Sequence, residues 1–140
     1  PDPHTFRGMP AGTGPRILIV DDNPDNQVVV ADFLRARGFT VEMASSADEG
    51  LARARANRPA LILMDVQMPA VDGLEATRMV RADPVLADIP VFALTSLAMK
   101  GDRERCLAAG MDDYISKPVK LTELLARIDQ RLSAPVARRA

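Results

Sequence analysis

Short apolar runs alternate with longer amphipathic runs along most of this chain, and no other feature constrains the fold as strongly. The apolar runs lie at 16–20, 40–44, 61–64, 90–94 and 113–116, each the length of a β-strand. The first, third and fourth are nearly uninterrupted, as in strands that are covered on both faces. Helical patterns follow each run, so the chain reads as five strand–helix units.

The helical patterns have recognisable ends. The first begins at Asn23–Pro24, an N-cap residue followed by proline at the first helical position, and stops at Gly38. The other four are predicted from Ser45–Ser46 to before Pro59, over 73–82, over 98–109, and over 121–132. The last repeats leucine and isoleucine at helical spacing, which indicates one buried face.

Five successive units of this kind predict an α/β fold. Right-handed crossovers give a parallel sheet with helices on both faces, the doubly wound architecture. Five strands fit the flavodoxin-like order 2-1-3-4-5 better than a six-stranded sheet. We therefore predict one domain over residues 15–133, a flexible N-terminal linker over 1–14, and a C-terminal tail over 134–140.

Composition excludes several classes of function. The net charge is −1 and no basic block precedes the terminal Arg138–Arg139, so direct nucleic-acid binding is not expected. No apolar run approaches the ~20 residues of a membrane span, and the first residues lack the pattern of a secretory signal. The single cysteine, Cys106, excludes an internal disulfide. A cytoplasmic protein without membrane insertion is expected.

Polar residues follow four of the predicted strands at their carboxyl ends. Asp21 and Asp22 follow the first strand, Asp65 the third, Thr95 the fourth and Lys117 the fifth. In a doubly wound sheet these ends meet at one edge, where ligands bind. Three carboxylates at close range repel one another unless a cation intervenes, and all-oxygen ligation in an open site suits Mg²⁺. The sequence thus predicts a magnesium site.

A carboxylate in such a site can also act as a nucleophile toward phosphorus, with lysine and threonine contacting the phosphoryl oxygens. Taken singly, each residue has an ordinary explanation. Asp22 can be a helix cap, Thr95 a turn hydroxyl and Lys117 a solvated surface lysine. Asp65 is harder to explain in this way, because it ends a buried strand and caps no obvious helix. The set together favours the functional interpretation.

Four segments in register resemble one known family. They are ILIVDDN, LILMDVQMPAVDG, VFALTSLAMKGD and AGMDDYISKPV, and the steps from Asp22 to Asp65, Thr95 and Lys117 are 43, 30 and 22 residues. The chain resembles the receiver domains of two-component response regulators. It is similar both to single-domain regulators of bacterial cell-cycle control and to receivers of hybrid sensor kinases, and the sequence leaves these two open. The start at Pro1 slightly favours excision from a longer protein.

The resemblance implies a role for each site residue. Asp65 would accept a phosphoryl group from a phosphohistidine on a histidine kinase or histidine phosphotransfer protein. The chain would be a switch, catalysing only its own phosphorylation and dephosphorylation. Its cofactor would be Mg²⁺, held by the Asp21, Asp22 and Asp65 carboxylates and the backbone carbonyl of Gln67.

The resemblance also implies how the switch responds. Lys117 would pair with the phosphoryl group, and the Lys117–Pro118 peptide would be cis. Thr95 would move to hydrogen-bond the phosphoryl group, and Tyr114 would swing inward, although an ordinary core role for Tyr114 stays open. The output surface would then comprise the fourth helix, fifth strand and fifth helix, which would contact a downstream protein or form a homodimer.

Smaller features carry weaker hypotheses. Residues 28–30 on the first helix are candidates to dock a histidine-bearing helical bundle, with core packing as the more ordinary explanation for part of the run. Residues 103–105 are candidate contacts on the fourth helix, with a solvated face as the more ordinary explanation. Leu97, two residues beyond Thr95, is expected to slow hydrolysis of the phosphoryl group.

Three other functions compete with the receiver interpretation. An Mg²⁺-dependent phosphatase with an aspartate nucleophile would place an Asp-x-Asp pair after the first strand, whereas this chain has Asp21–Asp22. A flavin-binding flavodoxin would need a phosphate loop there, and this acidic segment would repel phosphate. A scaffold that works without phosphorylation would be expected to lack Asp65 or Lys117.

Overall fold

The computed structural model describes residues 14–67, 72–95 and 101–133. Within them, five strands alternate with five helices. The strands are β1 (Arg16–Val20), β2 (Thr40–Ala44), β3 (Leu61–Asp65), β4 (Val91–Thr95) and β5 (Asp113–Ser116). The helices are α1 (Pro24–Ala36), α2 (Ala47–Ala56), α3 (Gly73–Ala82), α4 (Asp102–Ala108) and α5 (Leu121–Ser133). The predicted linker and tail lie almost entirely outside the described residues.

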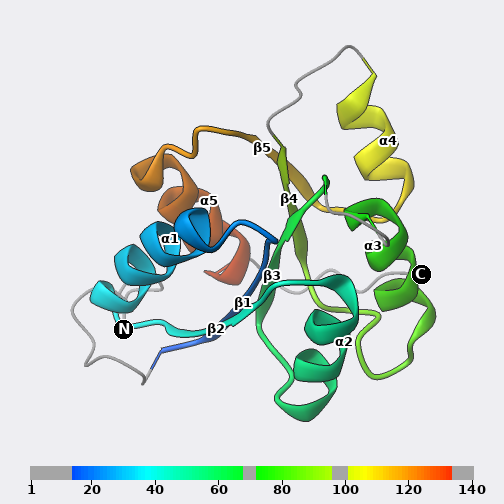
Figure 1. Ribbon diagram of the computed structural model, residues 1–140, viewed down its shortest axis with the longest axis horizontal. Helices are drawn as coiled ribbons and strands as arrows, with labels where there is room; N and C mark the ends of the chain where they lie inside the picture. The colour runs from blue at the N-terminus through cyan, green and yellow to red at the C-terminus, as the bar shows by residue number, and fades with distance from the viewer. Residues whose placement is uncertain (1–13, 68–71, 96–100, 134–140) are drawn as a thin grey trace.

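The strands form one parallel sheet in the order β2-β1-β3-β4-β5, which confirms the predicted topology. Figure 1 shows three layers, with α1 and α5 on one face of the sheet and α2, α3 and α4 on the other. The order reverses between β1 and β3, and the carboxyl ends of these two strands are neighbours. This is the switch point at which doubly wound sheets bind ligands.

Two hydrophobic clusters hold the layers together because successive residues of a strand point to opposite faces. On β1, Ile17 and Ile19 belong to the cluster beneath α1 and α5, while Leu18 and Val20 belong to the cluster beneath the other three helices. All five residues of β3 and all five of β4 are buried. The nearly continuous apolar runs of the sequence are therefore explained by burial on both faces.

The helix boundaries follow local chemistry. Ser46 caps α2 by accepting a hydrogen bond from the Glu49 backbone, and Asp72 caps α3 in the same way. One predicted boundary is wrong: the fourth helix was expected over 98–109 but α4 begins at Asp102. Gly101 precedes it with φ of 90°, a conformation that interrupts a right-handed helix. Residues 98–100 lie outside the described residues.

A largely buried guanidinium, that of Arg81, joins the elements on the α3 side of the molecule. Arg81 donates to the carbonyl oxygens of Ala87, Ile89 and Gly110, and to Asp112 Oδ2 at 2.9 Å. Its side chain is only 16% exposed, and that of Asp112 is 9% exposed. Arg81 thus ties the end of α3 to the turn between α4 and β5. No helix among the described residues is long and apolar enough to cross a membrane.

Candidate functional site

Three carboxylates meet at the switch point of the sheet. Asp21 and Asp22 follow β1, and Asp65 is the last residue of the adjacent β3. One oxygen from each lies within 4.8 Å of the other two. Asp21 and Asp65 are buried, whereas Asp22 is exposed. The strand order brings together residues 43 positions apart, as the sequence predicted.

Asp21 is held on both of its oxygens. Its Oδ1 accepts a hydrogen bond from the Asn23 backbone N–H at 2.9 Å, and its Oδ2 lies 3.2 Å from Lys117 Nζ. Burial of an ionised carboxylate is costly unless such partners are present, and Asp21 is only 2% exposed. Lys117 Nζ lies farther from Asp65 Oδ1, at 3.7 Å, than from Asp21 Oδ2. The lysine therefore compensates the charge of Asp21 more than that of Asp65.

The negative charge of the Asp65 carboxylate is less well compensated by its neighbours than that of Asp21. Its Oδ1 accepts the Gln67 backbone N–H at 3.0 Å. Burial raises the pKa of Asp65 to about 6, and the neighbouring Asp21 carboxylate acts in the same direction. The Gln67 N–H and Lys117 oppose this shift, because both stabilise the ionised form. A carboxylate in such surroundings gains from an additional cation.

A cleft of about 660 Å³ opens onto these groups. Asp65 is 3% exposed, yet it lines this cleft and is not sealed inside the protein. The acidic end of the cleft passes into an apolar wall formed by α1 and the start of α5. The lining residues are Asp21, Asp22, Asn23, Val29, Val30, Asp65, Gln67, Leu94, Lys117, Pro118, Val119 and Leu121.

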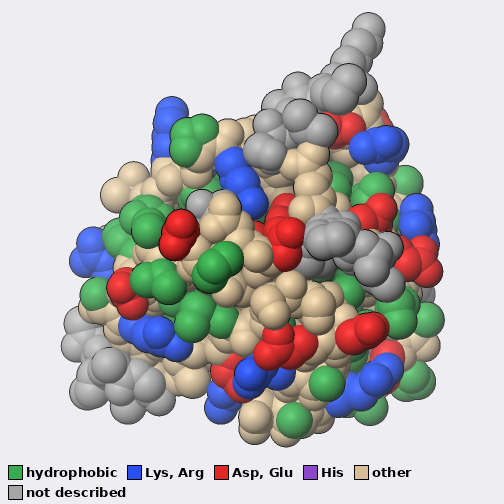
Figure 2. Space-filling model, viewed as in Figure 1, with side chains coloured by type: hydrophobic (Ala, Val, Ile, Leu, Met, Phe, Trp, Pro, Cys, Tyr) green, Lys and Arg blue, Asp and Glu red, His purple; other side chains and the backbone are tan. Residues whose placement is uncertain are grey.

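The apolar wall continues onto the outer surface of α1. Val28 and Val29 are 48% and 57% exposed, which is unusual for large aliphatic side chains. Figure 2 shows apolar side chains gathered on the side of the molecule where α1 lies. Val30 is buried in the core, so the three-valine run of the sequence divides between core and surface.

Thr95 and Tyr114 form a second group beside the cleft. Thr95 is buried at the end of β4, and its side chain is hydrogen-bonded to Tyr114. Tyr114 is partly buried and packs against the cluster that contains Cys106 of α4. Burial raises the pKa of Tyr114, and the nearby Asp102 carboxylate raises it further. The Thr95 side chain thus links the end of β4 to β5.

The donor set fits a hard divalent cation. Carboxylate oxygens are the ligands that Mg²⁺ prefers, and two oxygens on one Mg²⁺ at about 2.1 Å can lie up to about 4.2 Å apart. The three carboxylate oxygens lie within 4.8 Å of one another, so the cluster would need to close by only a little. The exposed Asp22 would leave the site open to solvent.

Most of the residues expected at the site lie together. Asp21, Asp22, Asp65, Gln67 and Lys117 all line the cleft, whereas Thr95 does not within the described residues. The Lys117–Pro118 peptide is cis, as the resemblance implied. Leu97 and Met68–Pro69 lie outside the described residues.

Two contributions at the site were not predicted. The Asn23 backbone N–H fixes Asp21, an arrangement that the Asp-x-Asn spacing could have indicated. Gly73 lies against β3, where a Cβ atom would collide with the carbonyl oxygen of Asp65. The glycine that follows Asp72 in the sequence was the available signal for this close approach.

The fold and this cleft together define a signalling domain of the receiver class. The chain belongs to the response regulator receiver domain family, whose family model matches residues 17–129. A curated relative, the polar-differentiation response regulator DivK of Brucella anthropi, is 41% identical over 116 residues, covering 83% of this chain and 94% of the relative. The chain is thus a DivK-like receiver domain of two-component signalling.

Solved structures agree with this assignment. The receiver domain of the sensor histidine kinase PA1611 from Pseudomonas aeruginosa PAO1 is 44% identical, with a TM-score of 0.77 and coverage of 86% of this chain and 98% of that one. That structure has a magnesium ion coordinated in its active-site cleft. A putative response regulator from Chloroflexus aurantiacus is 29% identical, with a TM-score of 0.82 and coverage of 88% and 100%.

Proposed function

We propose that Asp65 is the phosphoacceptor of a two-component phosphorelay and that the phosphoryl group switches the surface formed by α4, β5 and α5. The observation that carries this proposal is the position of Asp65. It is a buried carboxylate with a raised pKa, yet it lines an open cleft beside two further carboxylates and a lysine. A purely structural aspartate would not need that opening.

The transfer would exchange one bond to phosphorus for another. An Asp65 carboxylate oxygen attacks the phosphorus of a partner phosphohistidine, the P–N bond breaks, and the imidazole leaves and takes up a proton from solvent. Asp21, Asp22, Asp65 and the Gln67 carbonyl would hold Mg²⁺, which neutralises the phosphoryl oxygens when bound. The chain would catalyse no other reaction.

Lys117 and Thr95 would bind the incoming phosphoryl oxygens. Lys117 Nζ lies within 3.7 Å of Asp65 and is held at the site by Asp21, so it can reach a phosphoryl oxygen on Asp65 with little movement. Thr95 would have to turn its hydroxyl away from Tyr114 to donate to the phosphoryl group. Loss of this hydrogen bond would report phosphorylation to β5 and α4.

The partner that supplies the phosphoryl group would dock on α1. The exposed side chains of Val28 and Val29 adjoin the apolar wall of the cleft, so a helix that presents histidine to Asp65 would cover them. We expect Val29→Glu to slow transfer from a histidine kinase or histidine phosphotransfer protein. Phosphorylation by the small donor phosphoramidate should be unchanged, because that donor needs no docking surface.

The output would pass to a downstream protein or to a second copy of the chain. Residues 103–105 of α4 are exposed and lie on the proposed output surface, which makes them candidate contacts. Light scattering with and without beryllofluoride would show whether the activated chain forms dimers.

The decisive experiment is phosphorylation with phosphoramidate and Mg²⁺, followed by mass spectrometry of the intact chain. The wild type should gain one base-labile, hydroxylamine-sensitive phosphoryl group, and Asp65→Asn should gain none. Asp48→Asn is the matched control, because Asp48 is an exposed aspartate on α2 outside the cleft. Equal labelling of the Asp65→Asn variant would refute the assignment.

A further inference from the structure

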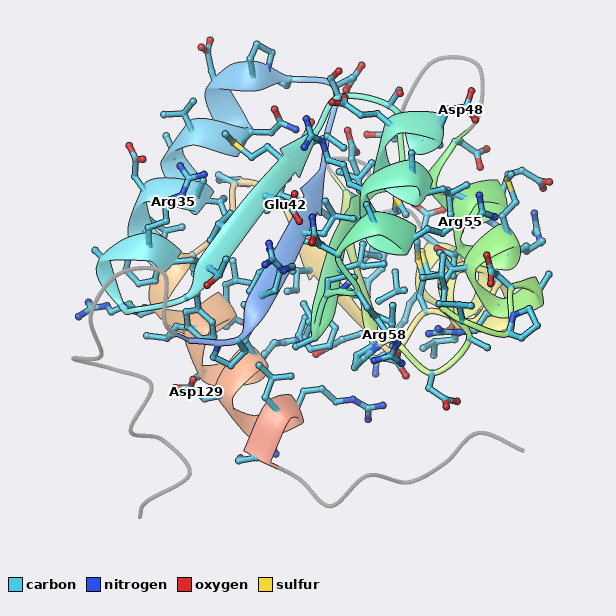
Figure 3. The ribbon with its side chains drawn as sticks, turned by 90° about the horizontal axis from the view of Figure 1, so that it is seen from below. Arg35, Glu42, Asp48, Arg55, Arg58 and Asp129 are labelled. Atoms are coloured by element: carbon cyan, nitrogen blue, oxygen red, sulfur yellow. The ribbon has the colours of Figure 1, made fainter. Side chains whose placement is uncertain are left out.

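The side chain of Gln27 connects α1 to β2, the edge strand of the sheet, close to the proposed metal-binding loop formed by residues 21–23. Gln27 lies on α1, soon after the loop, and is 7% exposed. Its Nε2 donates a hydrogen bond to the carbonyl oxygen of Ala44, the last residue of β2. The same oxygen accepts the backbone N–H of Asp21 at 3.0 Å. Figure 3 shows the end of β2 beside the start of α1.

We infer that Gln27 is a positioning residue for the metal-binding loop, an inference that rests on the proposed function of that loop. One carbonyl oxygen joins three segments: the first turns of α1, the end of β2 and the backbone of Asp21. The side chain of Asp21 points from this fixed backbone toward the Asn23 N–H and Lys117. Gln27 would act on the cation through Asp21 without touching it.

Packing alone does not explain a glutamine at this place. The neighbouring buried positions of α1 are Val30, Ala31 and Leu34, which are all apolar. A buried side-chain amide is costly unless it is hydrogen-bonded, so an apolar residue would fill position 27 at lower cost. The hydrogen bond to Ala44 satisfies the amide and fixes the start of α1 against the end of β2, beside the loop from Asp21 to Asn23 that connects β1 to α1.

The test compares Gln27→Met with Gln130→Met, a matched control on the exposed surface of α5. The first readout is the exchange rate of the Asp21 backbone amide, measured by NMR without any metal. The second is the Mg²⁺ dissociation constant, measured by calorimetry. We expect Gln27→Met to speed the Asp21 exchange and to weaken Mg²⁺ binding about tenfold, as loss of a group that supports a ligand commonly does. The control should change neither.

The inference is overturned if Gln27→Met keeps the Asp21 exchange rate and binds Mg²⁺ within about twofold of the wild type. Should this variant fail to fold, Gln27→Asn serves instead, since it keeps the amide but falls short of Ala44 and should show the same two losses. The proposed function fails separately, when the wild type takes up no phosphoryl group. The Asp21 exchange rate would still decide the role of Gln27 in that case.

Discussion

Replacing the buried carboxylate of Asp65 by a neutral amide should stabilise the metal-free protein. Burial and the adjacent Asp21 raise the pKa of Asp65 from 3.8 to about 6. A tenfold change in an equilibrium is worth about 1.4 kcal/mol, so ionising Asp65 costs the native state about 3 kcal/mol. Asp65→Asn keeps the shape and an oxygen that can accept the Gln67 N–H, but it cannot ionise.

The sign of this effect depends on pH. Because the pKa is raised in the folded state, ionisation opposes folding: the penalty is negligible below about pH 3.8, grows as the pH rises toward about 6, and is constant above that. Asp65→Asn should therefore be more stable than the wild type by about 2 to 3 kcal/mol near about pH 8, and by less than about 1 kcal/mol near about pH 4.

Urea denaturation of the metal-free protein at both pH values measures the effect. Asp32→Asn, an exposed aspartate on α1, is the control and should change stability by less than about 0.5 kcal/mol at either pH. Added Mg²⁺ should stabilise the wild type by mass action and Asp65→Asn much less. A gain in Asp65→Asn that does not depend on pH, or no gain near about pH 8, would refute the electrostatic argument.

Three further predictions concern other parts of the molecule. Arg81→Met should lower the free energy of unfolding by about 2 to 4 kcal/mol, because it removes the hydrogen bonds to three backbone carbonyls and to Asp112, whereas the exposed Arg78→Met should cost less than about 1 kcal/mol in the same urea titration. Asp102→Asn should lower the pKa of Tyr114, the single tyrosine, in an ultraviolet absorbance titration. Leu97→Asn should shorten the lifetime of the phosphorylated chain severalfold; an unchanged half-life would contradict the proposed role of Leu97.

The fold could be predicted because its main determinants are local. The apolar runs of β1, β3 and β4 are long enough to identify strands buried on both faces, and crossover handedness then restricts the topology. The start of α4 was predicted wrongly because the helical pattern of 98–109 continues through Gly101. A glycine inside such a pattern does not reveal from sequence that it adopts a positive φ.

The residues of the site were predictable for a different reason. Sequence places Asp21, Asp22, Asp65 and Lys117 at strand ends, and the sheet order alone brings strand ends together. What the order does not specify is how side chains share their partners. That Lys117 lies closer to Asp21 than to Asp65 depends on distances of a few tenths of an ångström, which follow from packing across β1, β3 and β5.

These unequal distances bear on how the switch is kept off. In the structure Lys117 donates a hydrogen bond to Asp21, and the Thr95 side chain is hydrogen-bonded to Tyr114. Both groups that would bind a phosphoryl oxygen therefore already have partners, and each would have to give up a hydrogen bond if Asp65 were phosphorylated. The loss of those hydrogen bonds would offset part of the attraction between the phosphoryl group and the lysine. Only the difference in interaction free energy between the two states can shift the equilibrium between them. In the mechanism that we propose, a cation that takes over the neutralisation of Asp21 would release Lys117 and so reduce this offset.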